Sequence, residues 1–116
     1  MKRVLIVNDK ATTRRIINLA LGQVPNLIVI GEANNGWDAV DFVEAEQPDV
    51  IVMDFRMPLM DGLEATERIT KSWPHVKVVM HSMTGVSRQA GKAVGACAVL
   101  RPYDSMKMLQ TAVMDA

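Results

Sequence analysis

Two aspartates directly follow apolar runs, and this placement is the strongest sign of chemistry in the chain. Val4–Val7 is followed by Asn8 and Asp9, and Val50–Met53 is followed by Asp54. An apolar run that ends in an acid and a turn is typical of an α/β protein, whose parallel strands present reactive groups at the carboxyl edge of the sheet. If the two strands are neighbours, Asp9 and Asp54 lie close together, an arrangement that favours a hard divalent cation.

The composition is that of an ordinary single domain covering residues 1–116, large enough for one core without disulfides. Its 13 basic and 13 acidic residues cancel, so no nucleic-acid or membrane surface is indicated. The only cysteine, Cys97, cannot form an internal disulfide, and its short apolar run predicts a small core residue. The sequence predicts neither a signal peptide nor a membrane span, and we expect a cytoplasmic domain.

Five short apolar runs alternate with helical patterns along the chain. The runs are Val4–Val7, Leu27–Ile30, Val50–Met53, Val76–Met80 and Ala98–Leu100. Most are apolar at successive positions, as in parallel strands that are covered on both faces. This alternation, with right-handed crossovers, predicts an α/β fold with a doubly wound sheet, whose ligand site lies at the ends of the first and third strands.

Amphipathic spacing predicts a helix after each run. The clear helices are residues 13–21, Gly36 to Glu46, Asp61 or Gly62 to Ser72, and a last helix with Asp104 or Ser105 as its N-cap. The segment from Val86 to Val94 has poor helix propensity and few large apolar residues, which predicts a short or irregular fourth helix.

Two kinds of polar residue outside these acids have simpler interpretations. Asp61, before Gly62, is interpreted as a turn residue or helix cap. His75 lies in a predicted loop and His81 within a predicted strand, and neither position indicates a phosphohistidine, which needs an exposed helical site.

The ordered motifs resemble the receiver domain of bacterial two-component response regulators over essentially the whole chain. The matching stretches are Val4–Asp9, Gly31–Ala33 with Asn35–Gly36, Pro48–Val50, Met53–Pro58 and Asp61–Thr66, together with Ser82 and Pro102. Gly31–Ala33 and Gly62–Thr66 are most similar to the NarL/FixJ-type subfamily, which usually carries a helix-turn-helix output domain. The resemblance implies a CheY-like (βα)₅ fold, a flavodoxin-like three-layer sandwich with a parallel five-stranded sheet of order 2-1-3-4-5.

The resemblance also implies a phosphorylation site that depends on Mg²⁺. Asp54 is the expected phosphoacceptor, whose carboxylate attacks phosphorus to form an acyl phosphate. Asp9, Asp54 and the backbone carbonyl of Arg56 are the expected metal ligands, and Asn8 is expected to bind weakly or through water. Because Asn8 stands where the family generally has an acid, we expect weaker Mg²⁺ binding than is usual.

Two further residues are implied to contact the phosphoryl group. Ser82 matches the hydroxyl that hydrogen-bonds it, and Arg101 stands where the family has a lysine that pairs with it. The family's lysine-proline bond is normally cis, so a cis Arg101–Pro102 bond is expected. A planar guanidinium does not replace a compact ammonium conservatively. Ala98 occupies the place of an aromatic that usually moves inward on phosphorylation, so the switch is expected to be atypical.

Two classes of function remain open from the sequence. The first is a receiver, not an enzyme, that accepts a phosphoryl group on Asp54 from a sensor histidine kinase or histidine phosphotransfer protein, with homodimer formation left open. The second is a phosphorylation-independent pseudo-receiver that acts as a protein-docking module. Neither contacts nucleic acid or a membrane through this domain. A flavodoxin-like ligand binder is disfavoured, because no Gly-rich phosphate loop follows the first strand.

Overall fold

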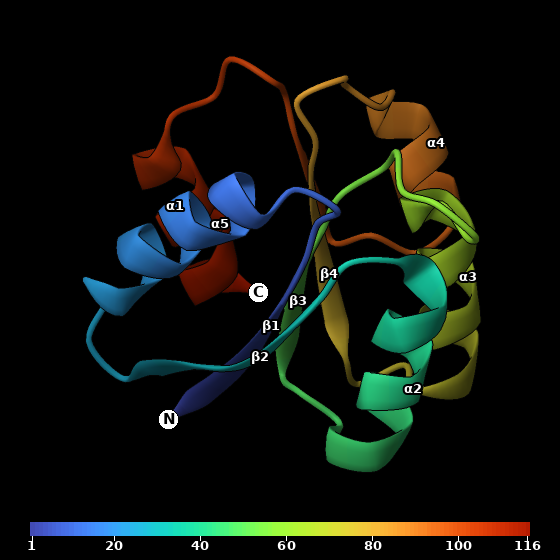
Figure 1. Cartoon of the computed structure of the whole chain (residues 1–116), viewed down its shortest axis with the longest axis horizontal. Helices are drawn as coiled ribbons and strands as arrows, with labels where there is room; N and C mark the ends of the chain where they lie inside the picture. Colours follow the sequence, from blue (N-terminus) through green and yellow to red (C-terminus); the bar gives the residue numbers. More distant parts are fainter.

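A parallel five-stranded sheet forms the centre of the computed structural model, which describes all residues from 1 to 116 (Figure 1). Its strands are β1 (Lys2–Val7), β2 (Leu27–Ala33), β3 (Val50–Met53), β4 (Lys77–His81) and β5 (Ala98–Leu100). The strand order is β2-β1-β3-β4-β5. The predicted α/β fold, doubly wound and flavodoxin-like, is therefore confirmed.

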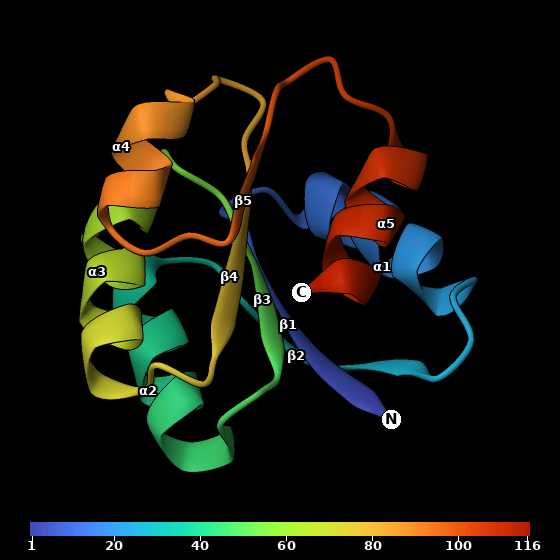
Figure 2. The same cartoon turned by 180° about the vertical axis from the view of Figure 1, so that it is seen from behind.

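Five helices cover the two faces of the sheet. They are α1 (Ala11–Gly22), α2 (Gly36–Glu46), α3 (Gly62–Ser72), α4 (Arg88–Ala93) and α5 (Met106–Asp115). Helices α1 and α5 lie on one face, and α2, α3 and α4 lie on the other (Figures 1 and 2). The short fourth helix was predicted and is confirmed. No helix combines the length and apolarity needed to cross a bilayer.

Two hydrophobic clusters fix the sheet between its helix layers. A cluster of 14 buried residues joins the sheet to α2 and α3, and a cluster of 12 joins it to α1 and α5. Val4–Val7 and Val50–Met53 are buried along their whole length and contribute to both clusters. Each fully buried side chain of this kind stabilises the fold by about 1.5–3 kcal/mol. The central strand ends, where Asp9 and Asp54 follow, are thus held firmly in place.

Local side-chain caps determine where the helices beside the site begin. Asn35 Oδ1 accepts the Asp38 N–H before α2, and Asp61 Oδ1 accepts the Glu64 N–H before α3, each at 2.9 Å. Ser105, one of the two predicted positions, caps α5. These bonds satisfy N–H groups that have no partner within the helix. The prediction of Asp61 as a helix cap is confirmed.

The structure differs from the sequence prediction at two strands. Strand β2 continues past Ile30 to Ala33, because Gly31–Ala33 pairs with the end of β1 beyond a register shift after Val4. Strand β4 is displaced by one residue and includes His81, whose partner across the ladder is Leu100. Both extensions come from pairing with a neighbouring strand.

Cys97 is exposed, so its prediction as a core residue was wrong. Its backbone N–H pairs with Val78 at 2.9 Å, just before β5 begins at Ala98. Since β5 is the edge strand of the sheet, an apolar run at this position does not require burial of every side chain.

Candidate functional site

Strands β1 and β3 are neighbours, and their carboxyl ends carry the two predicted acids. Val7 lies opposite Met53 in the ladder, and the Asp54 N–H donates to the Val7 carbonyl at 2.9 Å. On the other side of β1, the Asn8 N–H donates to the Ala33 carbonyl at 3.0 Å. The backbone at this edge is therefore bonded across three strands, which positions the side chains that follow.

The Asp54 carboxyl group is largely withdrawn from solvent, with 7% of the residue exposed. Its Oδ1 accepts the Phe55 N–H at 2.8 Å. Burial raises the pKa of Asp54, and the neighbouring Asp9 charge raises it further, whereas the nearby Ser82 hydroxyl and the Phe55 N–H lower it. An ionised Asp54 is thus poorly solvated, and a cation beside it would relieve this cost.

A small cavity of about 190 Å³ opens beside Asp54. Its lining residues are Asn8, Asp9, Lys10, Thr13, Asp54, Arg56, Met83 and Thr84. The structure therefore brings together the four predicted metal-site residues. It adds Lys10 and Thr13, which follow Asp9 in the chain, and Met83 and Thr84, which follow Ser82. All four could have been predicted, because each lies close in sequence to a predicted site residue.

Asn8 shapes the loop between β1 and α1. It is 3% exposed, and its Oδ1 accepts the Lys10 N–H at 2.9 Å. Its backbone carbonyl accepts a hydrogen bond from Arg14 at 2.8 Å, and Arg14 also pairs with Glu32. The Asn8 side chain is therefore already engaged in a turn, although an amide oxygen has a second lone pair for a ligand.

The oxygens at this cavity suit a hard divalent cation that retains several waters. The lining residues include two carboxylates, Asp9 and Asp54, together with Asn8 and Arg56. No group of three or more His, Cys, Asp or Glu side chains is placed to hold a metal. Asn8 stands at the position where a third acid would complete such a group.

Ser82 lies at the end of β4 and is 1% exposed. Its Oγ lies 3.0 Å from the Thr84 Oγ1, and it is close enough to Asp54 to lower the pKa of that carboxyl group. The ends of β1, β3 and β4 thus bring Asp9, Asp54 and Ser82 to one place.

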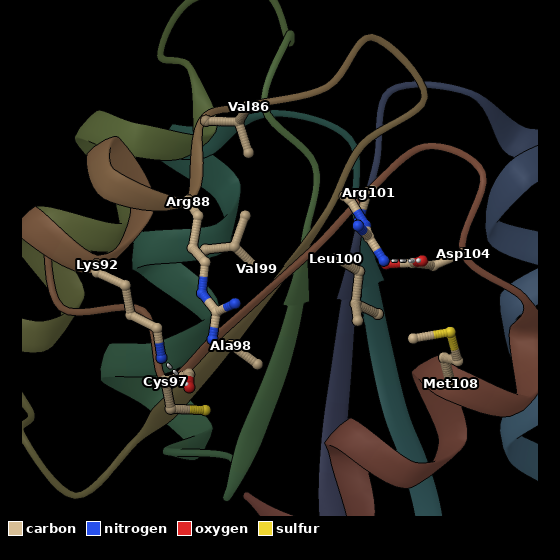
Figure 3. A pocket seen from close by; sticks show the side chains of 10 residues that line it. All are labelled: Val86, Arg88, Lys92, Cys97, Ala98, Val99, Leu100, Arg101, Asp104 and Met108. Atoms are coloured by element: carbon tan, nitrogen blue, oxygen red, sulfur yellow. Dashed lines mark hydrogen bonds and ion pairs between the residues drawn. The ribbon is translucent and has the colours of Figure 1, made fainter.

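Arg101 lines a different cavity, between α4, β5 and the segment before α5 (Figure 3). Its Nη2 lies 3.4 Å from the Asp104 Oδ1, and its guanidinium lies 4.9 Å from the centre of the Tyr103 ring. The structure does not bring its side chain to the cavity beside Asp54.

The prediction of a cis Arg101–Pro102 bond was wrong, since the chain contains no cis peptide bond. Residues 101 to 104 form a local turn instead. The Arg101 N–H donates to the Asp104 Oδ2 at 2.7 Å, and the Asp104 N–H donates to the Arg101 carbonyl at 3.0 Å. These bonds satisfy the backbone with the trans isomer, which is the intrinsically favoured one.

His81 is a buried histidine whose two ring nitrogens have no hydrogen-bond partner. It is 2% exposed and lies immediately before Ser82. It shares a face of β4 with Val79, which belongs to the cluster against α1 and α5. Burial lowers the pKa of the imidazole, although the Asp104 charge acts in the opposite direction. Protonated His81 is therefore disfavoured in the folded protein.

Replacing His81 by leucine is expected to stabilise the domain by about 1 kcal/mol at pH 7, because a buried polar group without partners is costly. The gain should increase below about pH 6.5, where the unfolded chain takes up a proton that folded His81 resists. Urea unfolding at pH 7 and pH 5 measures both effects. His75→Gln, at an exposed position, is the control. An unchanged pH dependence in His81→Leu would contradict this account.

The comparisons with known proteins agree with this geometry. The model of the response regulator receiver domain family matches residues 4–111. Protein-glutamate methylesterase/protein-glutamine glutaminase 4 of Myxococcus xanthus is 38% identical over 102 residues, which cover 85% of this chain and 29% of that protein. The chain thus spans less than a third of the length of this curated relative.

Two solved structures have the same fold. The response regulator domain of Thermotoga maritima CheB has a TM-score of 0.83 and 28% identity, with 97% of this chain and 90% of that chain covered. The signal receiver domain of the response regulator NarL from Mycobacterium tuberculosis has a TM-score of 0.89 and 27% identity, with 97% and 93% covered. With the family match over residues 4–111, these findings show that the chain belongs to the response regulator receiver family of two-component signalling.

Proposed function

We propose that this domain accepts a phosphoryl group on Asp54 from a sensor histidine kinase or histidine phosphotransfer protein. The observation that carries the proposal is the meeting of Asp9, Asp54 and Ser82 at the ends of three adjacent strands, beside an open cavity. The domain acts as a signalling module and not as an enzyme with a separate substrate.

The chemistry follows from the environment of Asp54. The Phe55 N–H holds Oδ1, which leaves Oδ2 as the attacking oxygen. This oxygen bonds to phosphorus while the N–P bond of a phosphohistidine breaks, and the imidazole leaves with the bonding electrons. In this proposal the buried Ser82 hydroxyl donates a hydrogen bond to the transferred group.

A Mg²⁺ ion would be held by Asp9, Asp54 and the backbone carbonyl of Arg56, with Asn8 contributing weakly or through water. When bound, this ion offsets the negative charge of the transferring phosphoryl group. The protein's own part is to keep the two carboxylates side by side, where their mutual repulsion favours a cation. Burial raises the pKa of Asp54, and the Asp9 charge adds a smaller increase in the same direction.

Treatment with acetyl phosphate and Mg²⁺ tests the proposal directly. Intact mass spectrometry should show the addition of one phosphoryl group, and chelation of Mg²⁺ by EDTA should prevent it. Absence of any modification across donor and metal concentrations would instead favour a protein-docking module.

One observation favours that second function. Arg101 is engaged with Asp104, and Ala98 lies half-buried beside a cavity of about 430 Å³ with no aromatic ring to fill it (Figure 3). A face without the usual moving ring responds less to phosphorylation. We therefore propose atypical switching, and the docking function would apply if phosphorylation fails.

The substitution Asn8→Asp is expected to strengthen Mg²⁺ binding about fivefold to tenfold, since a carboxylate a few ångströms from the cation adds on the order of 1 kcal/mol. The new carboxylate can still accept the Lys10 N–H that Asn8 accepts. Titration calorimetry gives the affinity. Asn26→Asp adds the same charge before β2, at the opposite edge of the sheet, and should change nothing. Equal affinities in Asn8→Asp and the unchanged protein would mean that residue 8 does not face the metal.

A further inference from the structure

The cavity beside Asp54 is lined by two cationic residues, Lys10 and Arg56, whose side chains have no part in the function proposed above. A phosphoryl group on Asp54 carries negative charge that a single divalent ion only partly offsets. Positive groups that line the same cavity are therefore candidates to contact it.

Arg101 is poorly placed to contact a phosphoryl group on Asp54. Its side chain is 63% exposed and points toward Asp104 (Figure 3). The guanidinium also lies over the Tyr103 ring. Moving it to Asp54 would cost the ion pair with a carboxylate that is only 6% exposed, as well as the ring contact. The turn that closes residues 101 to 104 holds the Arg101 backbone in place.

Lys10 has the opposite features. Its backbone is fixed, because its N–H donates to the Asn8 Oδ1 at 2.9 Å, at the position that precedes α1. Its exposed side chain takes part in none of the hydrogen bonds or ion pairs of the structure, although Asp9 is its neighbour in sequence. The ammonium group is therefore available to a ligand that enters the cavity.

Arg56 is less available than Lys10. Its guanidinium lies over the Phe55 ring, 5.3 Å from the ring centre. A compact ammonium on a flexible stem also suits a phosphate oxygen as a point charge, whereas a guanidinium requires a planar, two-point fit.

We propose that Lys10 supplies the cation that faces the phosphoryl group on Asp54, in place of Arg101. The inference rests on the proposed function, since it assigns a contact to the group transferred there. The positive charge then comes from the loop after β1, next to Asp9, and not from the loop after β5. In this assignment the Asn8 side chain orients the loop after β1, because its Oδ1 accepts the Lys10 N–H.

The test compares Lys10→Gln, Arg56→Gln and Arg101→Gln for two properties. The first is the rate of phosphorylation by acetyl phosphate, and the second is the affinity for beryllofluoride with Mg²⁺, followed by ¹⁹F NMR. Lys10→Gln is expected to lower both about tenfold, as for loss of one exposed contact to a developing anion. Lys10→Arg should recover part of the loss. Arg56→Gln and Arg101→Gln should lose less, and Lys107→Gln, an exposed control on α5, should lose nothing.

The outcomes separate this inference from the function itself. If the unchanged protein is phosphorylated and Lys10→Gln reacts at the same rate, or if Arg56→Gln or Arg101→Gln loses as much, the assignment of Lys10 is overturned and the function stands. If no donor phosphorylates the protein but beryllofluoride binding depends on Lys10, the contact is supported and the function fails. If the unchanged protein shows neither reaction nor binding, both are overturned.

Discussion

Replacing Asp54 by asparagine is expected to abolish phosphorylation by acetyl phosphate completely. The amide cannot attack phosphorus as a carboxylate does, and no other acid has the same buried position between Asp9 and Ser82. The measurement is intact mass after exposure to the donor with Mg²⁺. The added phosphoryl mass should appear in the unchanged protein and fall to background in Asp54→Asn.

The matched control for this substitution is Asp61→Asn. Asp61 is an exposed acid in the same connection between β3 and α3, and asparagine can replace it as the cap of that helix. This variant should be phosphorylated as fast as the unchanged protein. Modification that survives in Asp54→Asn, or that disappears in Asp61→Asn, would place the phosphoacceptor elsewhere.

The substitution Asp54→Asn should also stabilise the domain when no metal is bound. Burial raises the pKa of Asp54, so the folded protein holds its proton more tightly than the unfolded chain does. Stability is then lost as pH rises from about 3.8 through the folded pKa, and the loss persists at neutral pH. Asp54→Asn should therefore melt a few degrees higher at pH 7. At pH 3, Asp54 is protonated in both the folded protein and the unfolded chain, so the difference in melting temperature should vanish.

Replacing Gly62 by alanine is expected to cause the largest loss of stability among single methyl additions. A Cβ at Gly62 would overlap the Asp54 carbonyl oxygen and lie 3.0 Å from the Phe55 Cα. Both are backbone atoms that cannot rotate away, and the Gly62 N–H is already bonded to the Phe55 carbonyl at 2.7 Å. We expect a cost of about 3 kcal/mol and a fall in melting temperature of roughly 10 °C.

Gly22→Ala is the control, because nothing lies within 4 Å of a Cβ at this helical position. It should be neutral or slightly stabilising, since alanine favours helix by about 1 kcal/mol over glycine. Any structure that survives in Gly62→Ala must displace the Asp54 backbone, so its phosphorylation should also slow. Equal stability of the two variants would show that the loop between β3 and α3 does not pack against Asp54 as described.

The sequence alone determined the order and type of the elements and the place of the main acids. Continuous apolar runs such as Val50–Met53 specify parallel strands, because such strands are covered on both faces. A strand that ends in an acid fixes where that acid lies once the strands are parallel, so Asp9 and Asp54 could be placed together in advance. The Asp61 cap was also predictable, because it involves only residues adjacent in the chain.

Only the tertiary structure decided which charges surround Asp54. Whether Arg101 reaches it depends on the turn at residues 101 to 104 and on the capture of its side chain by Asp104 and Tyr103. The sequence does not reveal whether Arg101 contacts Asp54 or is held instead by Asp104 and Tyr103. The exposure of Cys97 and the burial of His81 likewise depend on strand pairing, since a shift of one residue moves a side chain to the other face.

The remaining features of the site depend on packing between loop residues that are not adjacent in the sequence. Gly62 is needed because the loop folds back onto the carbonyl of Asp54, a contact that no local pattern reveals. Lys10 entered the site because the loop after β1 turns toward β3, held by the side chain of Asn8. Local residue patterns determine strands, helices and caps, whereas the charge beside Asp54 is decided by how the loops after β1, β3 and β5 pack and by which side chains they leave free.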